Sequence, residues 1–237
     1  MDKPNARGGN MRIIDLSHEV YSGMPQRFPG PIPSIFDHSI RSSAHYTAVD
    51  DSSILQHHLG THVDAPRHYN PKKGAAVHQV PLEQLITQAV VINLTHLKPL
   101  MEVGVKDLEE ALAKAGETIR PKDGVLVYVG MGPKYHTWTS GDWRASEYGR
   151  APYLGEDAVR WLLSKQISIL AIDALAPDWA EDRRPVHEIL LRDNGIPIIE
   201  NLCNLDKLDR SRVLFIALPP KIVGAAGYPV RAVAIEE

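Results

Sequence analysis

The 237-residue sequence contains a single cysteine, Cys203. One thiol cannot form a disulfide within the chain or build the cysteine clusters that hold structural zinc. We therefore expect Cys203 to be a small packing residue, and this usage agrees with a cytoplasmic protein in a reducing environment. No apolar run approaches the roughly 20 residues that a membrane-spanning helix needs, so we expect no membrane segment.

An excess of charge of either sign is also missing. The 26 lysines and arginines nearly balance the 29 aspartates and glutamates, which gives a formal net charge of −3. A chain with this balance has no general attraction to nucleic acid or to an anionic membrane, and we expect neither as a partner. Hydrophobic residues make up 43% and charged residues 23%, which is typical of a soluble globular protein.

Two common catalytic motifs do not occur. Residues 130–133, Gly-Met-Gly-Pro, follow an apolar run but lack the third glycine of a dinucleotide-binding loop. Pro133 also removes one of the amide donors that such a loop needs. The sequence has no Gly-x-Ser-x-Gly elbow, which argues against a serine hydrolase of that type.

Strand-like and helix-like patterns alternate through the middle of the chain. Several apolar runs are unbroken and of strand length, as expected for strands covered on both faces. Helical spacing separates them, which favours an α/β architecture. We expect strands at 12–16, 89–94, 124–129, 167–173, 196–200, 213–218 and 230–235, and helices at 105–115, 155–166 and from Pro81 through Ile86.

No linker, charge block or internal repeat divides the chain, so we expect one domain over residues 12–237. Residues 1–11 are polar and predict a flexible N-terminal tail. Residues 22–34 carry four prolines and two glycines. This composition predicts an ordered loop or an arm rather than a helix.

The most informative stretch is His-His-Leu-Gly-Thr-His-Val-Asp-Ala-Pro-Arg-His, which begins at residue 57. His58 and His62 are four residues apart and Asp64 follows two later, so a turn running into a strand can aim all three at one point. Gly60 permits a tight turn, and Pro66 disfavours a long continuous helix. Imidazole and carboxylate groups commonly bind zinc, manganese or iron. A lone histidine is more often structural, but this combination predicts a metal site.

A second candidate segment lies near the end of the chain. His187 stands at the start of a predicted short helix that Gly195 can end, and Glu200 ends the strand that follows. Because a helix and the next strand run in opposite directions, His187 and Glu200 can lie close together. Spacing leaves open the alternative that Glu200 is an exposed strand end and His187 a capping residue. Asp173, at the end of another strand, is a further candidate.

Taken together, these motifs resemble the cyclase family of metal-dependent hydrolases, which includes bacterial kynurenine formamidases and isatin hydrolases. The resemblance covers residue 12 to the C-terminus, and the histidine stretch is its most specific part. Further matching segments follow in the same order: Ile14-Asp15-Leu16-Ser17, Met24-Pro25, Pro81-Leu82-Glu83, Ile172-Asp173, His187 through Leu202, and Gly224 through Arg231.

The resemblance implies a divalent metal cofactor, Zn²⁺ or Mn²⁺. His58, His62 and Asp64 would bind the first ion. In two-metal members, Asp64 would bridge to a second ion held by His187 and Glu200.

The same resemblance implies that His68 stays off the metal and acts first as general base and then as general acid. It implies a compact α/β domain of the swivelling β/β/α type with a mixed sheet, and a homodimer or homotetramer. Partner segments often help to close the active site in this family, which would suit the arm at 22–34. One departure is that many relatives carry a hydroxyl residue shortly after the position of Asp173, whereas residues 174–176 are Ala-Leu-Ala.

The expected function is hydrolysis of an amide or lactam C–N bond by metal-activated water. The small-molecule substrate would be an N-formyl aryl amine such as formylkynurenine, or a cyclic amide such as isatin. Tyr135, Trp138 and Trp143 lie on a loop and could stack on an aromatic substrate. Two alternatives stay open: a lactone hydrolase with the same metal site, and a metal-binding protein without turnover in which His187 and Glu200 close the coordination sphere.

Overall fold

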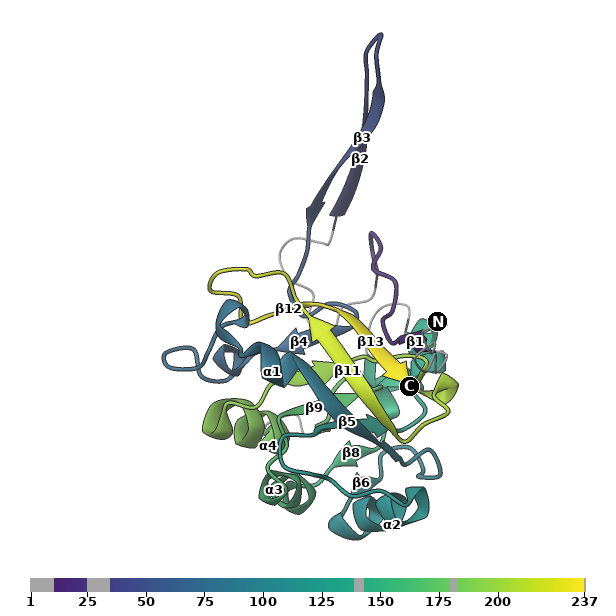
Figure 1. The fold of residues 1–237 in the computed structure, drawn as a ribbon, viewed down its shortest axis with the longest axis vertical. Coiled ribbons are helices and arrows are strands. Elements are labelled where there is room, and N and C mark those ends of the chain that lie inside the picture. The colour runs from purple at the N-terminus through teal and green to yellow at the C-terminus, as the bar shows by residue number, and fades with distance from the viewer. Residues whose placement is uncertain (1–10, 25–34, 139–142, 180–182, 237) are drawn as a thin grey trace, which may run out of the picture.

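A nine-stranded mixed sheet organises the fold (Figure 1). The computed structural model describes residues 11–24, 35–138, 143–179 and 183–236. The strand order is β1-β13-β11-β5-β7-β9-β10-β4-β12. The strands span β1 Arg12–Asp15, β4 His62–Asp64, β5 Ile86–Asn93, β7 Gly124–Tyr128, β9 Ile169–Ile172, β10 Ile198–Glu200, β11 Arg212–Leu218, β12 Gly227–Pro229 and β13 Arg231–Glu236.

The middle of the sheet is parallel and its two ends are antiparallel. Strands β5, β7, β9 and β10 run in the same direction, each paired with the next. Strands β11, β13 and β1 add to one side as antiparallel neighbours, and β4 and β12 add to the other. The fold is therefore mixed α/β with both parallel and antiparallel pairing, as expected from the sequence.

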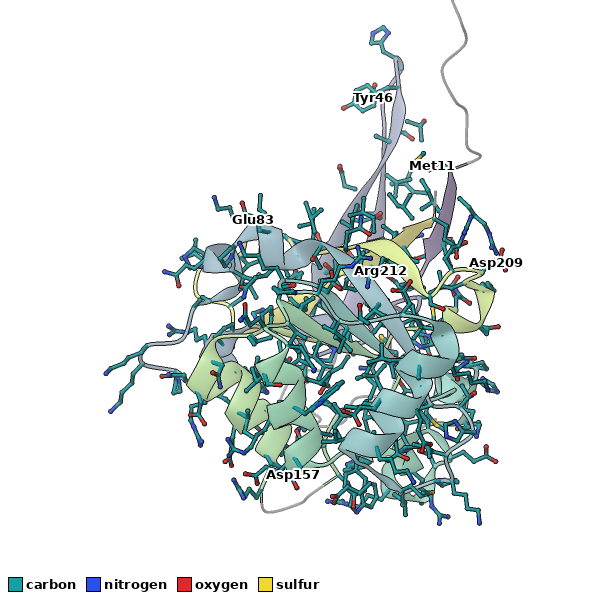
Figure 2. The ribbon with its side chains drawn as sticks, turned by 60° about the horizontal axis from the view of Figure 1, so that its bottom comes forward. Met11, Tyr46, Glu83, Asp157, Asp209 and Arg212 are labelled. Atoms are coloured by element: carbon teal, nitrogen blue, oxygen red, sulfur yellow. The ribbon has the colours of Figure 1, made fainter. Side chains whose placement is uncertain are left out.

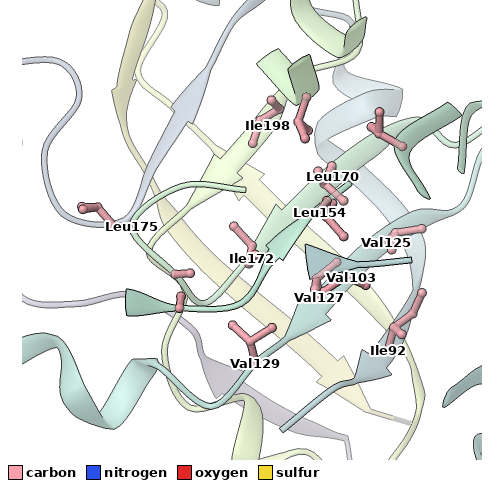
Figure 3. Close-up of a cluster of buried hydrophobic side chains, with 14 of the residues drawn as sticks. Ile92, Val103, Val125, Val127, Val129, Leu154, Leu170, Ile172, Leu175 and Ile198 are labelled. Atoms are coloured by element: carbon pink, nitrogen blue, oxygen red, sulfur yellow. The ribbon is translucent and has the colours of Figure 1, made fainter. Parts of the chain in front are cut away.

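The central strands are apolar without interruption because both of their faces are buried. Alternate residues point to opposite faces, so Val125 and Val127 of β7 enter one core while Leu126 enters the other. The first core lies under α2 Val105–Ala115 and α3 Glu156–Ser164, and Figure 3 shows part of it. The second core is enclosed by the sheet itself, since β1, β4, β11 and β13 all contribute buried residues to it.

Local sequence signals account for the best-defined helix, α2. Its start is stabilised by the Asp107 carboxylate, which accepts a hydrogen bond of 2.8 Å from the Gly104 backbone N–H. Leu108 and Leu112 face the core, and the helix ends at Gly116, as the spacing predicts. No helix in the described part of the chain combines the length and the apolar character needed to cross a membrane.

A hairpin of β2 Ile35–Ser42 and β3 Thr47–Ile54 extends far from the rest of the molecule, with Tyr46 near its tip (Figures 1 and 2). Its pairing is continuous from Ile35 opposite Ile54 to Ser42 opposite Thr47. Side chains on it are exposed, including Ile40 and Val49 at 72% and 59%. No hairpin is predicted here from the sequence, because neither face is buried and apolar alternation is therefore missing.

Several predictions about local structure were wrong in detail. The helix expected from Pro81 is only α1 Leu82–Leu85, and Ile86 already begins β5. The helix expected from His187 begins earlier, as α4 Pro185–His187, and continues as a π-helical segment, Glu188–Asp193. The short strand β12, and the pair β6 Glu102–Val103 and β8 Tyr153–Leu154, were not predicted. Residues 1–10 of the expected tail and residues 25–34 of the expected arm lie outside the described residues.

Candidate metal centre

The short strand β4 brings the metal-binding residue types together. His62 and Asp64 are two residues apart on β4, so their side chains share one face of the sheet. On the neighbouring strand β10, Glu200 pairs directly with His62 in antiparallel register, which puts its side chain on the same face. The predicted turn running into a strand is therefore confirmed, and pairing with β10 adds the acid.

Two glycines shape the loop around His58. Gly60 has a φ of +56°, a left-handed conformation that glycine adopts without steric cost. Gly227 of β12 packs against the His58 ring, and a Cβ at this position would lie 2.5 Å from His58 Cε1. A side chain at residue 227 would therefore displace His58 from its place beside β4.

The Asp64 carboxylate lies at the centre of the cluster. Its Oδ1 lies 2.5 Å from His58 Nδ1 and 3.3 Å from His62 Nε2. Its Oδ2 lies 3.3 Å from His187 Nε2 and 3.9 Å from His68 Nε2. One buried carboxylate is thus close to four imidazoles, three from residues 58–68 and one from α4.

Glu200 completes the buried part of the cluster. Its Oε2 lies 3.6 Å from His62 Nε2, and its Oε1 lies 3.3 Å from His187 Nε2. Glu200 Oε1 is nonetheless buried without an aligned hydrogen bond to any described residue. His58 Nδ1 and Asp64 Oδ1 form a hydrogen bond, but Glu200 Oε1 is left without one, and a cation between the converging ligand atoms would satisfy it.

Two hydrogen bonds fix the orientation of the buried rings. His62 Nδ1 lies 2.8 Å from the Gly60 carbonyl oxygen, and His187 Nδ1 makes a short hydrogen bond to Asp178. Because both partners accept, each Nδ1 carries the proton and each Nε2 is left to face the acids. This is the arrangement that metal-binding histidines adopt in proteins.

The residues present therefore fit a divalent cation. Two groups of described residues could each hold an ion, because within each group one ligand atom per residue lies within 4.8 Å of the others. The first group is His58, Asp64 and His68, and the second is His62, Asp64 and Glu200, so Asp64 belongs to both. His187 adjoins the second group through both acids. Nitrogen and oxygen donors of this kind suit Zn²⁺ and Mn²⁺ alike.

The electrostatics of the cluster show strong mutual interaction. Burial lowers the pKa of His62, but Asp64 and Glu200 outweigh burial and raise the pKa above its usual value. Burial likewise opposes a charged His187, yet Asp178, Asp64 and Glu200 hold its pKa well above 6.5. Burial raises the pKa of Asp64, but the surrounding histidines, His58 first, hold it well below its usual value. Protons on His62 and His187 would therefore have to leave when a metal binds.

His68 occupies a different environment, at the mouth of the cluster. It ends a 3-10 turn, Pro66–His68, and its ring stacks near His58 at a centroid distance of 4.1 Å. Burial lowers its pKa to about 4, with Asp64 opposing this effect. At neutral pH the ring is therefore neutral and can accept a proton.

An open pocket of about 120 Å³ leads to the cluster. The side chains of His58 and His68 are 32% and 31% exposed, so the cluster is accessible from this pocket. Tyr135, Trp138 and Leu175 form its apolar wall, and Gln56, Arg184 and Asn201 add polar groups. Tyr135 and Trp138 therefore lie where the predicted contact with a substrate in this pocket is possible.

Three other residues named in the sequence analysis lie outside the cluster and do not line the pocket. Trp143 does not line this pocket and packs on Trp179 instead, so the expectation for this residue was wrong. Asp173 accepts backbone N–H bonds from Val129, Met131 and Gly132, a structural role that ties β9 to the loop after β7. Burial raises the pKa of Cys203 to about 12, which agrees with its prediction as a packing residue.

Three residues that orient the cluster were not predicted. Asp178 holds His187, while Asn201 and Tyr148 hydrogen bond to each other beside His62. Asp178 lies nine residues before its partner, and Tyr148 lies 53 residues from Asn201. No local spacing rule connects such pairs, although the position of Asn201 directly after Glu200 was a usable signal.

Comparison with known proteins identifies relatives over nearly the whole chain. The Cyclase family profile matches residues 14–179. A kynurenine formamidase from Paracidovorax citrulli is 30% identical over 221 residues, covering 93% of this chain and 95% of that protein. A kynurenine formamidase from Bordetella avium is also 30% identical, covering 94% and 97% of the two chains.

Solved structures share the fold over nearly the whole chain. A structure described as a potential metal-dependent hydrolase with cyclase activity is 26% identical, with a TM-score of 0.72, and the match covers 96% of this chain and 98% of that one. Isatin hydrolase A from Ralstonia solanacearum is 23% identical with a TM-score of 0.79, over 97% and 93% of the two chains. At that identity the second likeness concerns the fold alone.

Proposed function

The chain belongs to the Cyclase family, and from that premise we propose that it is a metal-dependent hydrolase that cleaves an amide or lactam C–N bond with water. The observation that carries the proposal is the convergence of His62, Asp64, His187 and Glu200 beside an open pocket. The relatives named kynurenine formamidase, at 30% identity over most of both chains, support the amide class.

In this proposal the cluster holds one or two divalent ions. His58, His62 and Asp64 would hold the first ion, and His187 and Glu200, together with Asp64, would hold the second. When bound, a divalent ion lowers the pKa of a coordinated water and polarises a carbonyl oxygen. The buried acids offset the charge of the cation, and the Nδ1 hydrogen bonds of His62 and His187 keep their Nε2 atoms available.

His68 moves the proton. Its neutral Nε2 accepts a proton from the attacking water as the new C–O bond forms, and returns it to the leaving nitrogen as the C–N bond breaks. The depressed pKa of about 4 keeps the ring neutral before each turnover. The distance of 3.9 Å to Asp64 Oδ2 lets this carboxylate stabilise the transient imidazolium.

The pocket favours a planar substrate. Tyr135, Trp138 and Leu175 provide an apolar wall for an aromatic ring, as in an N-formyl aryl amine or a cyclic aryl amide. Arg184 and Gln56 provide donors for a polar substituent. Leu175 follows Asp173 in the segment that lacks a hydroxyl residue, so its side chain contributes packing and no proton relay.

We also propose that the chain forms a homodimer or homotetramer. An isolated two-stranded hairpin is marginally stable in water, yet β2–β3 extends from the body with Ile40, Tyr46 and Val49 exposed. A second copy covering this hairpin would bury these side chains. Light scattering of the purified protein tests this directly, and a monomer at micromolar concentration would contradict it.

The test of the function uses metal-stripped protein restored with Zn²⁺ or Mn²⁺ and assayed on formylkynurenine, isatin and a matched lactone. Hydrolysis of an amide or lactam that depends on the restored metal supports the proposal. Hydrolysis of the lactone alone would make the chain an esterase. Stoichiometric metal without turnover of any substrate would make it a binding protein.

A further inference from the structure

Asn201, the residue after Glu200, joins the metal-binding loop to the interior. Its Nδ2 donates a hydrogen bond of 2.9 Å to the Gly60 carbonyl oxygen, and its Oδ1 accepts one of 2.6 Å from the Tyr148 hydroxyl. The same Gly60 carbonyl accepts the hydrogen bond from His62 Nδ1 at 2.8 Å. A continuous chain of hydrogen bonds therefore runs from Tyr148 to the His62 ring.

The chemistry of each group fixes which partner donates in each of these hydrogen bonds. The Gly60 carbonyl can only accept, so Asn201 must present its NH₂ group to it and its oxygen to Tyr148. His62 must likewise carry its proton on Nδ1. Its Nε2 is then the free nitrogen, and it lies 3.3 Å from Asp64 and 3.6 Å from Glu200.

The surroundings hold Asn201 in place on several sides. Its backbone N–H donates to the Ala174 carbonyl at 3.0 Å, and its own carbonyl accepts from the Thr61 hydroxyl at 2.5 Å. Its φ is +58°, a conformation that asparagine tolerates better than most residues. Asn201 and Tyr148 are both buried, at 4% and 0% exposure, so the hydrogen bond between them is shielded from solvent.

We propose that Tyr148 and Asn201 are positioning residues of the metal centre. The Tyr148 hydroxyl orients the Asn201 amide, the amide fixes the Gly60 carbonyl, and that carbonyl holds His62 with Nε2 toward the acids. The inference rests on the proposed function only in requiring that the cluster binds a metal. It assigns part of the strength of that binding to two buried residues that are not themselves ligands of the proposed metal.

Three variants test the proposal by zinc binding alone: Tyr148→Phe, Asn201→Gly and the double variant. Glycine adopts a φ of +58° without strain, so Asn201→Gly removes the amide and leaves the backbone conformation accessible. The readout is the dissociation constant for Zn²⁺ of the folded, metal-stripped protein, measured by competition with a chromophoric chelator. We expect each single variant to weaken zinc binding by about 10- to 100-fold, as for other partners of metal-bound histidines. The double variant should bind no more weakly than Asn201→Gly alone, because the two groups act in series.

Tyr135→Phe is the matched control. The Tyr135 ring packs 5.1 Å from Tyr148 and its hydroxyl is also buried, but that hydroxyl has no hydrogen-bond partner among the described residues. Zinc affinity should therefore be unchanged in this variant. Thermal unfolding of each metal-free variant separates a loss of stability from a loss of affinity.

Three results would overturn the inference: zinc affinities within twofold of wild type for both single variants, additive effects in the double variant, or lowered stability with unchanged affinity. The zinc-binding test of this inference can fail or succeed independently of the hydrolysis test of the proposed function. A wild-type protein that binds zinc but hydrolyses no amide would refute the function and leave the zinc measurements to decide the inference. A wild-type protein that binds no zinc would refute both.

Discussion

Replacing Asp178 with asparagine should weaken metal binding by changing which nitrogen of His187 carries a proton. In the native protein, Asp178 Oδ1 accepts from the Val186 N–H at 2.7 Å, and Oδ2 accepts from both the backbone N–H and Nδ1 of His187. All three bonds require an acceptor. Asparagine offers one oxygen, and its second position is an NH₂ group that can only donate.

The tautomer of His187 then changes. If the asparagine oxygen keeps the Val186 bond, its NH₂ group faces His187 Nδ1, which must become an acceptor. The ring proton moves to Nε2, the atom that lies 3.3 Å from both Asp64 and Glu200. A metal ligand with a proton in this position cannot donate its lone pair. We expect zinc affinity to fall about 10- to 100-fold, which corresponds to about 1.4–2.8 kcal/mol.

Zinc titration of metal-stripped Asp178→Asn protein against a competing chelator measures this effect. Asp193→Asn is the control, because it also removes one carboxylate charge, at an exposed residue that ends the helical segment after His187 and pairs with Arg192. Its zinc affinity should equal that of wild type. Wild-type affinity in folded Asp178→Asn protein would refute the argument from the tautomer.

Further predictions concern proton transfer, substrate charge, stability and pH. His68→Gln should lower amide hydrolysis by about 10²- to 10⁴-fold at unchanged metal content, and loss of the metal as well would make His68 a ligand. Arg184→Gln should raise the KM of an aryl formamide that carries a carboxylate by about tenfold or more, and it should leave the KM of the uncharged aryl formamide unchanged. An equal change in both KM values would exclude a contact between Arg184 and the carboxylate. Asp173→Asn should lower the free energy of unfolding in denaturant by about 1–3 kcal/mol, because it leaves backbone N–H groups unsatisfied, and wild-type stability would contradict this role. The pKa values of His62 and His187 are raised, so protons compete with zinc to pH values above 6.5. The dissociation constant for zinc should therefore still fall as the pH rises beyond 6.5, and a constant that is already level there would contradict the pKa shifts.

Local spacing was sufficient for the part of the site that lies in one segment. His58, His62 and Asp64 come together because a glycine turn runs into β4, and residues two apart on a strand share a face. His187 and Glu200 lie close together because the helical segment after His187 runs back toward the start of β10. Their roles as ligands, and that of His68 as base, remain predictions for the zinc and activity measurements to decide.

Two of the orienting residues could not be predicted for a physical reason. Asp178 and Tyr148 act through contacts created by tertiary folding, and their identities carry no periodic signal. The same applies to β2–β3, whose strands lack apolar alternation because no core covers either face. The strand β12 is three residues long, too short for a pattern, and it depends on pairing with β4.

The most direct test of the account is to follow bound metal and amide hydrolysis in one sample. The protein is stripped with a chelator, then titrated with Zn²⁺ or Mn²⁺ while metal content and formamide or lactam turnover are measured at each step. The account predicts that activity is lost with the metal and returns in proportion to its restoration. Undiminished turnover by the stripped protein would contradict it.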